Sequence, residues 1–149
     1  FLPTITSHFP CGTCSVCRFT THTKELTLSP SFTWKQLTHT NCNTTNCIYL
    51  INCPCQKRYV GMTMRAVKTR ITEHRRTIRC GRASTRLTMH FREAKQTADE
   101  ISWTVLESVK MSYNMERTLL LKEQRWVHRL DTSHTGFNDS IPWSMLSQL

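Results

Sequence analysis

Two short apolar runs near the middle of the chain limit its fold more than any other feature. They span Cys47–Ile51 and Lys57–Gly61, and the Cys53–Gln56 segment between them has the composition of a turn. Runs of this length that are rich in β-branched and aromatic residues, and that are joined by a turn, are typical of paired strands. The segment therefore predicts an antiparallel hairpin.

Helical spacing follows the hairpin. Val67, Ile71, His74 and Ile78 recur along one face of a predicted helix over 64–79, which Gly81 ends. The remaining predicted elements are a helix over 84–95 with Ser84 as its N-cap, a strand over 101–109, a helix over 114–130 and a loop over 131–139. The order β-β-α-α-β-α predicts an α/β fold, in which helices flank a small three-stranded antiparallel sheet.

Residues 1–46 differ in character from the rest. They are rich in Thr, Ser, Pro and Cys and show little periodicity. A segment of this composition buries too little apolar surface to fold alone, so it is either a flexible linker or a loop structure held by a metal. We therefore expect a cysteine-rich extension over 1–46 and a separate domain over 47–149.

The spacing of Cys11, Cys14 and Cys17 is typical of metal ligands. Zn²⁺ requires four thiolate or imidazole ligands in a tetrahedron, and Cys42 is the best fourth candidate. Cys53 or Cys55 are the alternates for that place, and His8, His22 and His39 are weaker ones. Free thiols in a linker, or disulfides in an extracellular cysteine-rich basic protein, remain open readings of the eight cysteines.

The net charge of +10, from 20 Lys and Arg against 10 Asp and Glu, favours a polyanionic partner. The basic residues cluster between Arg58 and Arg92, although a solvated basic face without a ligand would give the same pattern. No apolar stretch approaches the roughly 20 residues of a membrane span. Because the chain starts at Phe1, we expect it to be a fragment of a longer polypeptide.

Glu123 lies among apolar residues on its predicted helix. Within about 60° of it around the helix are Leu119, Leu120, Trp126, Val127 and Leu130. A carboxylate on an inward face requires a cation beside it, because an unpaired buried charge costs several kcal/mol, on the order of 3–5. That cation is either an arginine such as Arg70 or a hard divalent metal.

Several motifs together resemble the GIY-YIG nucleases. The positions that carry this resemblance, in chain order, are Cys47-Ile48-Tyr49, Tyr59-Val60-Gly61, Arg70, His74, Glu123 and Asn138. The segments that resemble the subgroup found in Penelope-like retroelements are Pro10–Cys17, Asn52–Cys55, Tyr59–Thr63, Arg70–His74, Met89–Phe91, Trp126 and Leu130–Thr132. Cys47 stands where most families have a leading glycine, and that subgroup also tends to lack it.

The resemblance implies a role for each of the six positions. Glu123 would hold a catalytic Mg²⁺ (or Mn²⁺), and Arg70 would contact the scissile phosphate. His74 would shuttle a proton or order the water, and Asn138 would hydrogen-bond the backbone of the site. Tyr49 is our first choice, ahead of Tyr59, for the group that accepts the proton of water. Its cationic helpers would come from Lys57, Arg58 and Arg70.

Without the resemblance, the helical pattern is also consistent with Arg70 as a surface residue and with His74 as a hydrogen-bonded residue of the core. The basic residues expected to contact DNA on the first helix are Arg65, Lys68, Arg75 and Arg76.

The sequence therefore predicts a metal-dependent DNA endonuclease of a Penelope-like element, with a structural Zn²⁺ in its extension. It would act in the nucleus, nick target DNA and leave a 3′-hydroxyl that primes reverse transcription. Its expected partners are DNA, the element RNA and a reverse transcriptase region of the same polypeptide. The alternative is a zinc-dependent nucleic-acid-binding module without cleavage activity.

Overall fold

A three-stranded antiparallel sheet lies at the centre of the protein in the computed structural model, which describes residues 6–81 and 85–139. Strand β5 (Cys47–Asn52) pairs with β6 (Arg58–Thr63) on one side and with β7 (Ser102–Ser108) on the other. In the β5–β6 hairpin, Tyr49 stands opposite Gly61. The predicted hairpin and the predicted three-stranded sheet are both confirmed.

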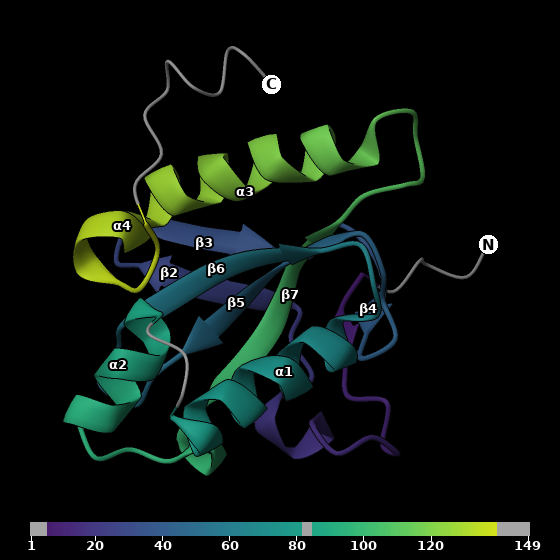
Figure 1. Ribbon diagram of the computed structural model, residues 1–149. Coiled ribbons are helices and arrows are strands. Elements are labelled where there is room, and N and C mark those ends of the chain that lie inside the picture. The colour runs from purple at the N-terminus through teal and green to yellow at the C-terminus, as the bar shows by residue number, and fades with distance from the viewer. Residues whose placement is uncertain (1–5, 82–84, 140–149) are drawn as a thin grey trace.

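Helices cover both faces of this sheet (Figure 1). The α1 helix (Val67–Cys80) and the α2 helix (Arg86–Glu93) lie on the face that contains Tyr49 and Ile51. The α3 helix (Met115–Leu130) packs on the face that contains Ile48 and Leu50. The central strand is buried on both faces, which explains why its sequence is apolar without alternation. The predicted α/β fold is confirmed.

The helix ends follow local chemistry. Gly81 ends α1 with φ of 63°, in the left-handed region that glycine adopts freely. The N-cap of α2 is Thr85, whose hydroxyl accepts a hydrogen bond from the Thr88 backbone N–H. The predicted N-cap, Ser84, lies outside the described residues. No helix in the described ranges is long and apolar enough to cross a membrane.

Three regions contain more structure than the sequence predicts. The predicted loop after α3 includes a short helix, α4 (Thr132–Thr135), and a 3-10 helix, η2 (Ala98–Glu100), precedes β7. The N-terminal segment forms four short strands and a 3-10 helix: β1 (His8–Phe9), η1 (Cys17–Phe19), β2 (Glu25–Ser29), β3 (Phe32–Lys35) and β4 (Thr40–Asn41).

The β2–β3 hairpin packs against the sheet. The indole N–H of Trp34 donates to the carbonyl of Leu106 at 2.8 Å, and the Gln36 side chain donates to the carbonyl of Val105 at 2.6 Å. Both carbonyls belong to β7, an edge strand, so the hairpin satisfies backbone groups that an edge strand leaves unpaired. The extension therefore shares core contacts with the sheet, and the predicted boundary at residue 47 stays a prediction.

Candidate active site

A cavity of about 570 Å³ opens between α1, α3 and the segment that follows α4. Five of the six residues predicted to act in catalysis line it: Tyr59, Arg70, His74, Glu123 and Asn138. The sixth, Tyr49, is fully buried, and its hydroxyl lies 2.8 Å from Nε2 of His74. Residues from four separate parts of the sequence therefore meet at one place.

Gly61 makes room for Tyr49. A Cβ atom at position 61 would lie 2.3 Å from both Cζ and the hydroxyl oxygen of Tyr49, far inside contact distance. The Tyr49 ring therefore lies directly against the β6 backbone at Gly61, and glycine is the only residue without a side chain to block this contact. This close approach is the physical reason for a glycine in the Tyr59-Val60-Gly61 motif, because it lets the hydroxyl reach His74.

The two tyrosines differ in access to the cavity. Burial raises the pKa of Tyr49 well above its usual value, and burial also raises the pKa of Tyr59. The positive charge of Arg70 opposes the rise in both pKa values. Only Tyr59 lines the cavity, so its hydroxyl is the better placed of the two to meet a water molecule.

Among the three cations predicted to assist Tyr49, Arg70 opposes the rise in its pKa. The Arg58 guanidinium instead donates to the carbonyl of Leu28 at 2.9 Å. Lys57 acts on His90, whose pKa it helps to lower, after the larger effect of burial. The prediction for Arg58 is therefore corrected, because its side chain turns toward the β2–β3 hairpin.

Arg70 is held by a carboxylate of its own helix. Its guanidinium lies 2.9 Å from Glu73, which also accepts both arms of Arg65 at 2.8 and 2.9 Å. Hydrogen bonds from these two arginines lower the pKa of Glu73 to about 2. Glu73 thus stays ionised and orients Arg70 at the cavity wall, a role that the sequence did not reveal.

Glu123 carries the signature of a cation site. Burial raises its pKa to about 7, against the opposing effects of a Met62 backbone hydrogen bond and the Arg70 charge. Among the described residues no ion pair joins Glu123 to a cation, and the alternative partner, Arg70, pairs with Glu73. A half-buried carboxylate that faces a cavity without a cation of its own fits a hard divalent metal.

His74 and Asn138 complete the cavity wall. Burial and the nearby Arg70 lower the pKa of His74 to about 4, so its ring is neutral at neutral pH. The Asn138 side chain accepts from the Val60 N–H at 2.8 Å and donates to the Val60 carbonyl at 2.7 Å. The expected backbone hydrogen bond of Asn138 is confirmed, and it fixes the chain after α4 against β6.

Arg86 is a further part of this wall that the sequence did not single out. Its guanidinium donates to the carbonyl groups of Ser133, Gly136 and Asn138. A Cβ atom at Gly136 would lie 2.1 Å from the Arg58 carbonyl, so the segment also needs glycine there. Such contacts between distant loops have no periodic signal in a sequence.

Three of the four predicted DNA-contacting residues face outward, and the fourth does not. Arg65 and Arg76 are exposed and Lys68 is half-buried. Arg75 is 7% exposed, donates to Asp99 at 2.6 Å and lies 4.2 Å from the centre of the Phe19 ring. The DNA-binding prediction for Arg75 is therefore corrected, and its position four residues after Ile71 could have indicated the buried face.

The Cys11, Cys14, Cys17 and Cys42 thiols gather within 4.8 Å of one another. Individual sulfur–sulfur distances are 3.2 Å for Cys11–Cys17 and for Cys14–Cys17, and 3.6 Å for Cys17–Cys42. The backbone N–H of Cys11 donates to the Cys42 sulfur, and that of Gly12 donates to the Cys17 sulfur. Such hydrogen bonds stabilise the thiolate form that binds a metal. The set fits a tetrahedral Zn²⁺ site, with Cys42 in the predicted fourth place.

The alternate ligands form a different group. Cys53 and Cys55 lie 3.1 Å apart, and each sulfur is 3.2 Å from Nε2 of His90. These three residues could also hold a metal ion, with one further ligand. The structure thus separates Cys53 and Cys55 from the first cluster, and the sequence did not indicate His90.

Replacing Cys14 with Ser should remove one equivalent of zinc and lower the melting temperature, because structural zinc supplies folding free energy. The effect should extend beyond the extension, since Val16 and Phe19 belong to the core around Tyr49. Cys80→Ser is the matched control, because Cys80 is exposed and outside both clusters. Metal analysis and thermal melting check this, and equal zinc content in Cys14→Ser and the wild type would contradict it.

No protein-family model matches the sequence, and no curated protein matches it. Among solved structures, the chain is similar to a mutant of the catalytic domain of intron endonuclease I-TevI, with a TM-score of 0.53 and 20% sequence identity. The match covers 62% of this chain and 91% of that domain. The fold is therefore similar to that of this catalytic domain, which agrees with the fold that the sequence resemblance implied.

Proposed function

We propose that this chain is a DNA endonuclease that hydrolyses phosphodiester bonds with the help of a divalent metal. The observation that carries the proposal is the meeting of Tyr59, Arg70, His74, Glu123 and Asn138 in one cavity. The sequence motifs indicate these five positions, and they lie together on a scaffold similar to the catalytic domain of an endonuclease.

In this proposal, Glu123 binds Mg²⁺ or Mn²⁺, and Arg70 binds the scissile phosphate. When bound, the metal would supply positive charge for the leaving 3′ oxygen. Arg70 adds a guanidinium that matches the phosphate oxygens and stabilises the charge that builds during hydrolysis. Glu73 keeps that guanidinium at the cavity wall.

We assign the contact with the attacking water to Tyr59 in place of Tyr49, because only Tyr59 lines the cavity. Burial and the Glu123 charge raise the pKa of Tyr59, while the Arg70 charge and a hydrogen bond with Tyr49 oppose that rise. A metal bound at Glu123 would offset the carboxylate charge and so favour the phenolate form. Neutral His74 forms a hydrogen bond with the Tyr49 hydroxyl. Tyr49 then positions the site without touching the substrate.

We further propose that the nick primes reverse transcription in the nucleus, by a reverse transcriptase region of the same polypeptide and on the element RNA. The resemblance of Asn52–Cys55 and Met89–Phe91 to Penelope-like elements supports this. Priming requires a free 3′-hydroxyl at the nick. The test is to add a DNA polymerase and labelled nucleotides directly to plasmid nicked by the protein. Extension without prior phosphatase treatment is expected, and extension only after removal of a 3′-phosphate would overturn the priming role.

Arg76→Gln should weaken binding to duplex DNA about threefold to tenfold at low salt and reduce the salt dependence of binding, because one phosphate contact is lost. Arg76 is exposed on α1. Arg79→Gln, also exposed on α1 but outside the predicted set, is the matched control and should change affinity less. Titration at several salt concentrations measures this, and an unchanged salt slope for Arg76→Gln would remove α1 from the DNA-binding face.

A further inference from the structure

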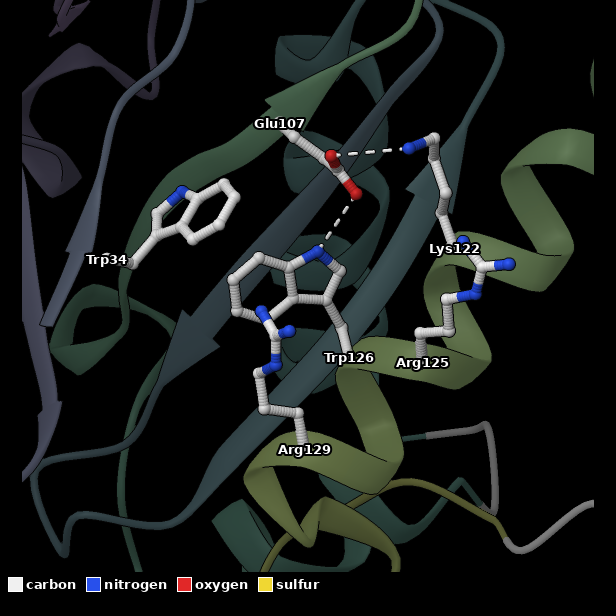
Figure 2. A pocket seen from close by; sticks show the side chains of 6 residues that line it. All are labelled: Trp34, Glu107, Lys122, Arg125, Trp126 and Arg129. Atoms are coloured by element: carbon white, nitrogen blue, oxygen red, sulfur yellow. Dashed lines mark hydrogen bonds and ion pairs between the residues drawn. The ribbon is translucent and has the colours of Figure 1, made fainter. Parts of the chain in front are cut away.

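A second hollow lies on another side of α3, away from Glu123. Its volume is about 210 Å³, and Figure 2 shows the side chains that line it. Four of them come from α3, while Trp34 comes from β3 and Glu107 from β7. The α3 residues are Lys122, Arg125, Trp126 and Arg129.

The two indoles of this hollow present rings without free donors. Trp34 and Trp126 meet edge to face, with ring centres 4.8 Å apart and planes at 88°. The Trp34 N–H donates to the Leu106 carbonyl, and the Trp126 N–H donates to Glu107 at 3.0 Å. Trp126 is buried, so a ligand could meet only the half-buried Trp34 ring. Because the Trp34 donor is used, that contact would be stacking or apolar.

The charge of the hollow is positive. Three cations line it against one carboxylate, Glu107, which lies 3.5 Å from the Lys122 amine. The Arg129 guanidinium lies 5.3 Å from the Trp126 ring, and Arg125 is exposed. Within the described part of the chain, neither arginine has a carboxylate partner, so both guanidinium groups remain available to an anion.

We propose that this hollow binds single-stranded DNA, with a base stacked at Trp34 and neighbouring phosphates at Arg125 and Arg129. An indole face at Trp34 beside unpaired guanidinium groups suits a chain of planar bases and phosphates. A base can stack on a side chain only when the base itself is unpaired. The inference rests on the proposed function, because α3 also supplies Glu123.

The test is fluorescence anisotropy of a labelled single-stranded 12-nucleotide DNA, a length chosen to span about one binding site. The double variant Arg125→Gln/Arg129→Gln should lose about tenfold or more in affinity. The matched control, Lys110→Gln/Arg117→Gln, removes two exposed charges outside the hollow and should lose less than about threefold. Thermal melting confirms that each variant is folded.

Stacking is tested separately with an oligomer of abasic sites of the same length. The wild type should bind it at least about fivefold more weakly than the normal oligomer. Trp34→Leu keeps an apolar side chain in the hairpin and should erase that difference.

Equal losses in the two double variants, or equal binding of abasic and normal DNA, would overturn the proposal. Tighter binding of RNA than of DNA of the same sequence would assign the hollow to RNA and overturn it also. Nicking of duplex plasmid by the same variants keeps the two ideas apart. Normal nicking by Arg125→Gln/Arg129→Gln together with weakened binding of single-stranded DNA supports the proposed binding site. A wild type that does not nick DNA contradicts only the proposed function.

Discussion

Glu123→Gln should abolish Mg²⁺-dependent nicking, with a loss of at least about a thousandfold, while DNA affinity stays the same or rises slightly. Gln keeps the shape and the hydrogen-bonding capacity of Glu, so α3 should remain packed. It lacks the negative charge that a hard divalent ion requires. Removing that charge also lessens repulsion of the DNA phosphate, which accounts for the possible gain in affinity.

Glu116→Gln is the matched control, because Glu116 is an exposed carboxylate on the same helix. It should nick at the wild-type rate. Melting temperature, DNA affinity and nicking rate measured on one preparation separate the metal-ligand role from a structural one. A structural role predicts a lower melting temperature with cleavage preserved in the folded fraction, and near wild-type nicking by Glu123→Gln in saturating Mg²⁺ would contradict the assignment.

Tyr59→Phe should retain the fold and DNA affinity and lose about 100-fold to 10,000-fold in cleavage rate, because only the proton acceptor in the cavity disappears. Tyr49→Phe should lose less, about tenfold, since it removes the hydrogen bond that holds His74 and leaves Tyr59 in place.

Tyr113→Phe completes this series as an inert control, because Tyr113 is 99% exposed and outside the cavity. Single-turnover cleavage of a labelled duplex gives the three rates. A dead Tyr49→Phe beside an active Tyr59→Phe would restore Tyr49 as the proton acceptor, as the sequence first suggested.

The strands and helices around the cavity could be predicted because their patterns are local. The apolar run of β5 and the spacing of Val67 and Ile71 on α1 depend only on nearby residues. The inward position of Glu123 followed from the helical period in the same way. These elements carry most of the candidate site.

The parts that escaped prediction depend on contacts between distant segments. The β2–β3 hairpin is held in place because the Trp34 and Gln36 side chains donate hydrogen bonds to carbonyl groups of β7. Those carbonyl groups are about 70 residues away in the sequence. His90 lies on α2, far along the sequence from Cys53 and Cys55, and the tertiary structure brings the three side chains together. The charge of Arg75 favours an exposed position, whereas the side chain packs on Phe19 and pairs with Asp99 of other segments.

The most direct test of the central claim is nicking of supercoiled plasmid by the zinc-loaded wild-type protein, with Mg²⁺ present and with Mg²⁺ omitted. Zinc content is measured in both samples, so that loss of the structural metal cannot imitate loss of the catalytic one. We expect conversion to nicked circles only when Mg²⁺ is present. Tight plasmid binding without any nicking in Mg²⁺ or Mn²⁺ would contradict it and would instead indicate a nucleic-acid-binding module.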